Sequence, residues 1–328
     1  MPQNRINWVD WAKAIAIYAV VLGHVSRNSD PLWTIEVANI GRKFHVPLFF
    51  FVSGYLFRVK DNNFKDFIWN SGKSLIVPYL FFNLVSAAIL WKFQSPEVYQ
   101  NGFYGFLLVN GHAFAGPAWF LIVLFLIRLI AYGIEKLKSP LVQWGLIILM
   151  MVVSAILPFK ICMGVSSALL SFPFFFWGEQ FKKKGYLNTY LRQPLFIKTG
   201  SFLLLLLTCI LLREHSLSMD LGNAAYKGGN IVLSYLFVAL YVLMAISFCL
   251  LLNDISLRVV RIISAGCIVI MGFHMTVVQI LWAYANKFPE GISFLFKSPV
   301  NSITSYILSL FIAMALMRYA PILIGNRK

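Results

Sequence analysis

The sequence predicts an all-α polytopic membrane protein with about ten transmembrane helices. Of its 328 residues, 59% are hydrophobic and only 12% are charged, and the mean hydropathy is +0.76. A soluble globular domain is closer to half apolar and a quarter charged. The apolar residues form many continuous runs of a length that can cross a hydrocarbon core. Barrel strands would instead alternate over about ten residues, so the spans are helices.

Ten apolar runs are candidate spans, because backbone groups in lipid must be satisfied within each segment. Neither an internal repeat nor a long linker interrupts them. We therefore expect residues 1–328 to form a single transmembrane domain with no fused soluble domain. The expected spans are residues 9–27, 39–57, 74–93, 117–134, 141–157, 165–181, 199–212, 230–252, 262–285 and 302–320.

Basic residues predict the orientation of these spans. The net charge of +16 is compatible with nucleic-acid binding, but the lysines and arginines lie in short clusters between apolar runs, as the positive-inside rule describes. With the N-terminus in the cytoplasm, 18 of the 28 basic residues fall inside and nine outside, and Arg128 lies within a span. We therefore expect both termini in the cytoplasm and no nucleic-acid partner. The longest outside loops are then residues 94–116 and 213–229.

The first span, "WAKAIAIYAVVLGHVS", keeps a lysine and a histidine that membrane helices usually exclude. Lys13 and His24 are eleven residues apart, so they lie about 20° apart on one helix face and about 16 Å apart along the axis. A snorkelling lysine and a histidine bonded to a neighbouring helix are the plain structural explanations. The shared face favours a polar channel. Asp10 either pairs with Lys13 one turn later or is a helix-start carboxylate.

The second span places another histidine at a similar depth. His45, in "KFHVPLFFFVSGYLFR", lies at the outer mouth of the span, roughly level with His24. Two imidazoles there can line one cavity and act as bases near neutral pH. Metal binding is a weaker alternative, because no third ligand accompanies them. Ser53 and Gly54 are small and allow close helix contact.

Two further residues, one polar and one aromatic, are candidate site residues, whereas the cysteines are not. His274 lies inside the ninth span, where an interhelical hydrogen bond explains it about as well as a site does. Trp119 opens the fourth span, where it belongs to an aromatic belt or offers a stacking surface for a sugar. Four cysteines lie in or beside apolar segments without metal-like spacing, so we interpret them as core residues: Cys162, Cys209, Cys249 and Cys267.

Five segments together resemble the acyltransferase-3 family of integral membrane acyltransferases. In chain order they are "VDWAKAIAIYAVVLGH", "FHVPLFFFVSGYLF", "GKSLIVPYLFF", "PAWFLIVLF" and "SAGCIVIMGFH", and they cover nearly the whole chain. The first resembles the family's opening motif, in which ten residues separate a basic residue from a histidine. Lys13 stands where many members have arginine, so the charge is kept without the bidentate geometry.

The resemblance implies transfer of an acyl group, usually acetyl, from a coenzyme A thioester to a hydroxyl of a cell-surface glycan or glycolipid precursor. We accordingly expect acetyl-CoA or another acyl-CoA as the donor, no metal, and a place in the bacterial cytoplasmic (inner) membrane. The basic cytoplasmic face would hold the nucleotide phosphates, with Lys13 at the entrance. Asp10, Arg58 and Lys73 are assigned to the same acyl-CoA site.

A sugar hydroxyl needs a base during its attack, and the resemblance assigns that role to His24. His45 then orients this base or stabilises the charge that develops on the thioester oxygen. A covalent acyl group on His24 is a variant of the same chemistry. Ser53, Trp119 and His274 are expected to bind the acceptor or to line the cavity. The alternative function is a membrane transporter or polysaccharide exporter without acyl transfer; the acceptor sugar and the oligomeric state stay open.

Overall fold

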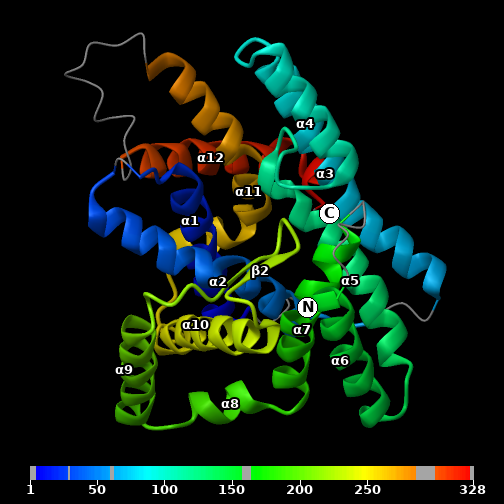
Figure 1. Cartoon of the computed structure of the whole chain (residues 1–328), viewed down its shortest axis with the longest axis vertical. Coiled ribbons are helices and arrows are strands. Elements are labelled where there is room, and N and C mark those ends of the chain that lie inside the picture. Colours follow the sequence, from blue (N-terminus) through cyan, green and yellow to red (C-terminus); the bar gives the residue numbers. More distant parts are fainter. Residues whose placement is uncertain (1–4, 29, 60–62, 157–163, 286–299, 326–328) are drawn as a thin grey trace.

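The computed structural model describes residues 5–28, 30–59, 63–156, 164–285 and 300–325, and nearly all of its regular structure is helical (Figure 1). A helix occupies each range in which a span is expected. These helices are α1 (Asn7–Val25), α2 (Leu32–Leu56), α3 (Phe64–Leu90), α5 (Trp119–Glu135), α6 (Pro140–Ile156), α7 (Val165–Lys183), α9 (Leu195–Leu211), α10 (Ile231–Leu251), α11 (Arg258–Ala285) and α12 (Val300–Tyr319).

Within the described part of the chain, six helical segments are long and apolar enough to cross a membrane. They are α1, α3, α10, α11, α12 and α5 together with the short turn before it. Shorter apolar helices lie in the ranges of α6 and α9. The predicted all-α membrane fold is therefore confirmed, whereas the number of spans and the side on which each terminus lies stay predictions.

Both segments expected as long loops contain regular structure. The first holds α4 (Pro96–Leu108) and the 3-10 turn η1 (Gly116–Ala118), and α4 begins where Ser95 caps it and Pro96 starts its first turn. The second holds an antiparallel hairpin of β1 (Ser218–Asp220) and β2 (Ala225–Lys227). Short helices α8 (Tyr186–Leu191) and η3 (Pro321–Ile324) complete the elements.

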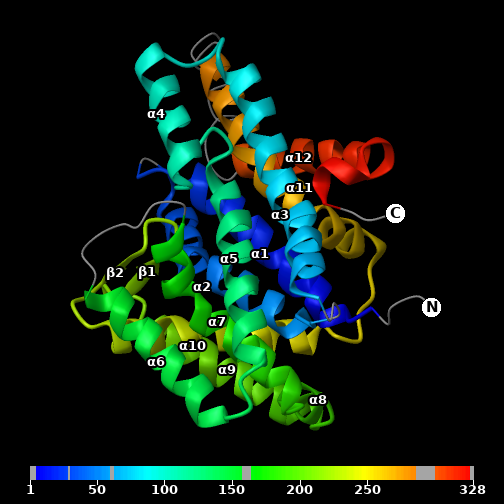
Figure 2. The ribbon, with the colours of Figure 1, turned by 90° about the vertical axis from the view of Figure 1, so that its right-hand side faces the viewer.

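Six helices close a ring around the interior of the molecule. Around this ring α1 packs on α2, α2 on α7, α7 on α5, α5 on α3, α3 on α11, and α11 on α1 again. Outside it, α6 covers α7, α10 covers α2, α9 covers α10, and α12 covers α11. Two perpendicular views place α1 near the middle of the molecule (Figures 1 and 2). Much of α1 is therefore surrounded by protein, although Lys13 is half-buried and His24 is exposed.

The tightest helix crossing joins α2 to α7 through a reciprocal pair of glycines. A Cβ added to Gly54 would overlap the carbonyl group of Phe175, and one added to Gly178 would overlap the carbonyl group of Phe51. Small residues at such a crossing let the two backbones approach closely, which gains van der Waals contact in a membrane. The expectation of close helix contact at Gly54 is confirmed.

Polar side chains fasten α3 to its neighbours. The Ser86 and Thr276 hydroxyl oxygens lie 2.7 Å apart between α3 and α11. The Asn83 side-chain oxygen accepts a 3.1 Å bond from the backbone N–H of Ala115. Because Ala115 immediately precedes η1, this bond holds the start of α5 and hence Trp119. The expected burial of the cysteines is confirmed for Cys209, Cys249 and Cys267, while Cys162 lies outside the described residues.

The glycine crossing predicts which helical glycines tolerate a methyl group. We expect Gly178→Ala to destabilise the protein by about 1–3 kcal/mol, because the new methyl forces α2 and α7 apart. Gly145→Ala on α6 is the matched control, since a Cβ there meets no atom within 4 Å. Thermal melting in detergent measures both variants, and equal melting temperatures would contradict the reciprocal contact.

Candidate functional site

The predicted polar residues of α1 open into two different cavities. Lys13 borders a cavity of about 560 Å³, and His24 borders one of about 810 Å³. The two residues are eleven positions apart on the helix, which is a distance of about 16 Å along the axis. Most of α1 between the two is buried, including Ile17, Val20 and Val21. One helix therefore serves both cavities, with Lys13 almost two turns after its start and His24 in its last turn.

The cavity at Lys13, here called the lysine pocket, lies inside the helix ring. Its walls come from α1, α2, α3, α5 and α11, with η3 contributing Ile324. Three cations line it, and none of the described residues that line it is acidic. Its polar side chains are Lys13, Ser53, Arg58, Asn70, Ser71, Ser74, Arg128 and Ser264. The pocket combines this positive charge with an apolar wall.

Arg128 is a cation of the lysine pocket that the sequence analysis did not assign to a site. It lies just past the middle of α5, within an expected span, and its side chain donates a 3.4 Å bond to the Ser74 hydroxyl of α3. An arginine inside an apolar run is costly in lipid, and this alone marks it as a candidate for a protein-lined cavity. The two long side chains, Lys13 and Arg128, thus reach one pocket from different helices.

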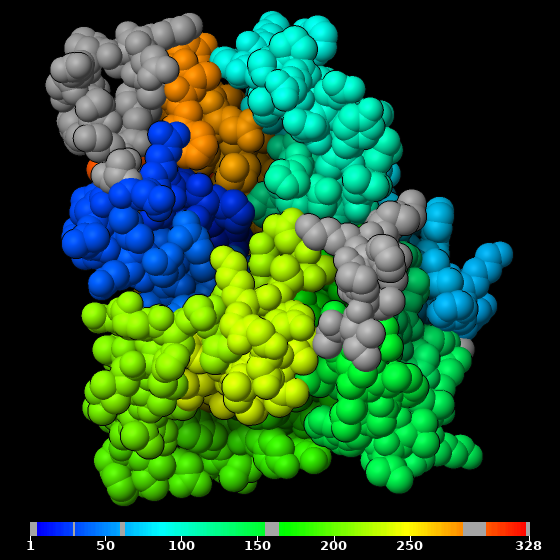
Figure 3. Space-filling view, in the orientation of Figure 1, coloured from blue at the N-terminus to red at the C-terminus, as the bar shows by residue number. Residues whose placement is uncertain are grey.

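The cavity at His24, here called the histidine pocket, lies between the end of α1, α2 and the hairpin segment. In Figure 3 this segment lies on the surface below α2. Trp119 lines the pocket, and a Cβ on Gly222 would overlap its indole ring, so the hairpin rests directly on Trp119. The other polar side chains that line it are Asn39, Arg42, Lys43, His45, His112, Arg213, His215, Ser216, Ser218, Asp220, Asn223 and Lys227.

Three histidines from α1, α2 and α11 share one local hydrogen-bonding arrangement. In each, ring atom Nδ1 lies within hydrogen-bond distance of the backbone carbonyl four residues earlier. Since a carbonyl oxygen only accepts, Nδ1 carries the proton and Nε2 keeps its lone pair. The distances are 2.7 Å for His24 to Val20, 2.7 Å for His45 to Gly41, and 2.9 Å for His274 to Ile270.

These histidines differ in their access to a ligand. The His24 side chain is exposed in its pocket, whereas His45 is 8% exposed and His274 is fully buried. The His274 ring packs edge-on against His24, with 5.2 Å between ring centroids. Its Nε2 atom has no hydrogen-bond partner within the described part of the chain. His24 is therefore the imidazole that a bound molecule meets first.

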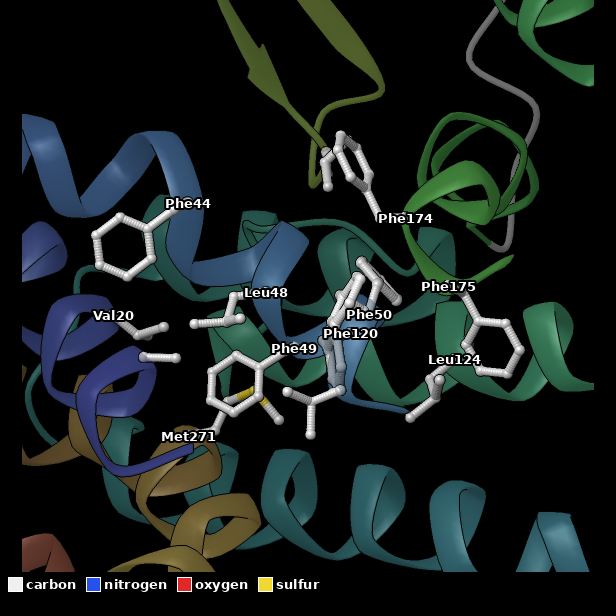
Figure 4. Packing of buried hydrophobic residues seen from close by; sticks show 14 of the residues in the cluster. Val20, Phe44, Leu48, Phe49, Phe50, Phe120, Leu124, Phe174, Phe175 and Met271 are labelled. Atoms are coloured by element: carbon white, nitrogen blue, oxygen red, sulfur yellow. The ribbon is translucent and has the colours of Figure 1, made fainter. Parts of the chain in front are cut away.

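A packed layer separates the two pockets. Trp119 lines the histidine pocket while the next residue, Phe120, lines the lysine pocket; Pro47 and Phe49 on α2 divide in the same way. Figure 4 shows the side chains of this layer from close by, and its labelled members include Val20, Leu48, Phe49, Phe120 and Met271. The layer is thin along α2 and α5, where residues one or two positions apart line different pockets, whereas about three turns of α1 lie between Lys13 and His24.

Other predicted site residues lie away from their expected partners. Asp10 forms an ion pair with Arg5 at 2.6 Å, not with Lys13. Lys73 is exposed, and its ammonium lies 4.6 Å from the centroid of the Trp69 ring, outside the residues that line the lysine pocket. Ser53 lines the lysine pocket and not the histidine pocket. In the described ranges, no group of three or more histidine, cysteine or acidic side chains could hold a metal.

The fold and the two pockets define a class, namely an integral membrane protein with a polar site enclosed by its helices. The chain matches the family model described as the acyltransferase domain, Acyl_transf_3, over residues 6–318. It therefore belongs to the acyltransferase-3 family, and the predicted resemblance is confirmed. This membership places it among the acyltransferases.

Two curated relatives are similar to part of the chain. The nodulation protein NolL of Sinorhizobium fredii is 32% identical over 126 residues, which cover 36% of this chain and 33% of that protein. The nodulation protein NolL of Mesorhizobium japonicum is 27% identical over 103 residues, which cover 29% and 26%. The chain thus spans a third or less of the length of these relatives. No solved structure is significantly similar to it.

The two-pocket arrangement predicts which side of the membrane reaches each residue. Ser53→Cys in the lysine pocket and Ser216→Cys in the histidine pocket are to be labelled with a membrane-impermeant thiol reagent. We expect inside-out vesicles to label only Ser53→Cys and right-side-out vesicles to label only Ser216→Cys. The parent protein is the control, because its described cysteines are buried. Labelling of both variants from one side would contradict the arrangement.

Proposed function

We propose that this protein is a membrane O-acyltransferase that moves an acetyl group from acetyl-CoA to a hydroxyl of a cell-surface glycan or glycolipid precursor. One observation carries the proposal: Lys13 and His24 stand on one helix yet open into two separate pockets. The lysine pocket would face the cytoplasm and the histidine pocket the opposite side. The chain would act as a single domain in the bacterial cytoplasmic membrane.

The charge of the lysine pocket supports its assignment to the donor. Coenzyme A carries several phosphate groups, and Lys13, Arg58 and Arg128 supply three cations without an acidic neighbour among the described residues that line the pocket. Arginine binds phosphate oxygens in a bidentate manner, while lysine acts as a compact point charge. The apolar wall, which includes Phe57, Leu75 and Leu124, suits the thin pantetheine arm.

The donor's acyl end must cross the packed layer to reach His24. We propose that the pantetheine arm passes between Phe49, Phe120 and Met271 when their side chains rotate, so that only the thioester enters the histidine pocket. Before that step the layer keeps water of the histidine pocket away from the thioester. This division would limit hydrolysis of the donor and is consistent with the burial of all three side chains.

His24 is suited to be the general base because its tautomer is fixed. With its proton on Nδ1 and bonded to Val20, the Nε2 lone pair is available to take the proton of the acceptor hydroxyl. The hydroxyl oxygen then attacks the thioester carbonyl carbon, the carbon–sulfur bond breaks, and the coenzyme A thiolate leaves. The proton held on Nε2 can then pass to that thiolate.

His45 and His274 support His24 in different ways. His45 also lines the histidine pocket, where its Nε2 lone pair would accept a hydrogen bond from a hydroxyl of the glycan and help to orient the acceptor. His274 touches the His24 ring from the buried side and limits its rotation. We propose that His24 acts as the base, His45 assists, and His274 is a positioning residue.

Replacing the base tests the chemical step. We expect His24→Gln to lower acetyl transfer to the glycan about 10²–10⁴-fold, the usual range for loss of a general base. Coenzyme A binding and the melting temperature should stay unchanged, because His24 does not line the lysine pocket. Mass spectrometry of the acetylated acceptor measures transfer. Wild-type activity in the variant would sink the assignment.

Replacing the cations tests the donor site. We expect Lys13→Gln or Arg128→Gln to raise the KM for acetyl-CoA about tenfold with a smaller change in kcat, because each loses a charge-assisted bond to phosphate. Lys138→Gln is the matched control, since Lys138 is exposed and does not line the pocket. An unchanged KM in both pocket variants would place the nucleotide elsewhere.

A further inference from the structure

The histidine pocket carries an excess of positive charge that the proposed acetyl transfer does not use. Its lining includes four cations and a single carboxylate, that of Asp220. The four are Arg42, Lys43, Arg213 and Lys227. Under the predicted orientation these residues lie outside, where the positive-inside rule expects few basic residues. The positive-inside rule therefore does not explain why these four cations gather in one pocket.

Internal ion pairs do not neutralise this charge. Arg213 pairs with Glu214 at 2.9 Å, and the Asp220 carboxylate accepts bonds from the backbone and side chain of Asn223 at 3.1 and 2.9 Å. Within the described residues, no carboxylate lies within ion-pair distance of the remaining three cations, Arg42, Lys43 and Lys227.

The Arg42 guanidinium lies next to the proposed base, His24, and some of its N–H groups stay available for a ligand. Nε and Nη2 donate to the Gly23 carbonyl at 3.2 and 2.5 Å, and Nη1 donates to the Asn39 side chain at 2.7 Å. Because Gly23 immediately precedes His24, Arg42 is held beside it. A guanidinium has five N–H groups, so these three contacts leave two for a ligand.

Lys43, the next residue along α2, also lines the histidine pocket and is held in place by the protein. Its ammonium donates a 2.7 Å bond to the Arg213 carbonyl and lies 5.0 Å from the ring centroid of Phe237 and 5.1 Å from that of Tyr241. Aromatic faces and one carbonyl offset part of the cost of a half-buried cation but bring no counter-charge. Cations in a concave site with low-dielectric walls focus their field on its contents.

We propose that the acceptor glycan carries an anionic group, a carboxylate or a phosphate, that binds to Arg42, Lys43 and Lys227 while a neighbouring hydroxyl faces His24. This inference rests on the proposed function for the role of the glycan as acceptor. A neutral sugar would leave three cations uncompensated, whereas an anionic group would offset part of their charge and fix which hydroxyl reaches Nε2. The charge would thus select both the substrate and the acylated position.

The test measures glycan binding without acyl transfer. Purified full-length protein in detergent is titrated with three probes: a galacturonic acid oligosaccharide, N-acetylglucosamine 1-phosphate and a neutral N-acetylglucosamine oligosaccharide. We expect at least one anionic probe to bind about tenfold more tightly than the neutral one, and added salt to weaken only that binding. Which anionic probe binds distinguishes carboxylate from phosphate.

Variants locate the binding. Lys227→Gln should weaken the anionic probe about tenfold; Lys227 is exposed on the hairpin, so the change leaves the helix packing intact. Arg42→Gln should do the same, and Lys92→Gln is the control, an exposed lysine that does not line the pocket. Equal affinity for neutral and anionic probes, or equal loss in Lys92→Gln and Lys227→Gln, would overturn the inference.

This readout separates the inference from the proposed function. Tight binding of an anionic probe that depends on Lys227, without any acetyl transfer, would support the anion site and reject the enzymatic proposal. Acetyl transfer to neutral glycans that is insensitive to Lys227→Gln would support the enzyme and reject the anion site.

Discussion

The position of α1 inside the bundle is the constraint on which the rest of the structure depends. Lipid cannot satisfy a lysine or a histidine, so a helix that carries both must face protein or a polar cavity along its whole length. Here α2, α10, α11 and α12 all pack on α1. Because Lys13 and His24 lie on one stripe of this enclosed helix, two polar pockets form at its ends and both are lined by protein.

The close α2–α7 crossing is a second constraint on the interior of the bundle. Gly54 and Gly178 let the two backbones touch at the turns that follow Phe51 and Phe175, and the four residues form a reciprocal contact. This contact fixes the path of α2, and α2 in turn presents His45 to one pocket and Ser53 to the other. The catalytic proposal therefore depends on glycines that touch neither pocket.

The two pockets are alike in charge and are kept apart by an apolar layer. Three cations line the lysine pocket and four line the histidine pocket. Among the residues that line the two pockets, Asp220 of the histidine pocket has the single carboxylate. The proposed enzyme, which moves an acyl group from a nucleotide thioester to an anionic glycan, would need such a division, since both ligands are anions that would approach from opposite sides. The packed layer around Phe49 and Phe120 prevents the pockets from becoming one channel, and His24, with Nε2 free, stands just beyond it.

The sequence by itself determined the helical membrane fold, the ranges of its long helices and the common stripe of Lys13 and His24, because these follow from apolar run length and from the 3.6-residue period. It also carried the family motifs. Tertiary structure decided which residues meet: Asp10 with Arg5, His274 with His24, and Arg128 with Ser74. It also placed Ser53 and Lys13 in the lining of one pocket. It also placed α4 and the hairpin where loops were expected. A helical period gives the direction of a side chain about its own axis, but only the packing of the neighbouring helices determines what that side chain faces.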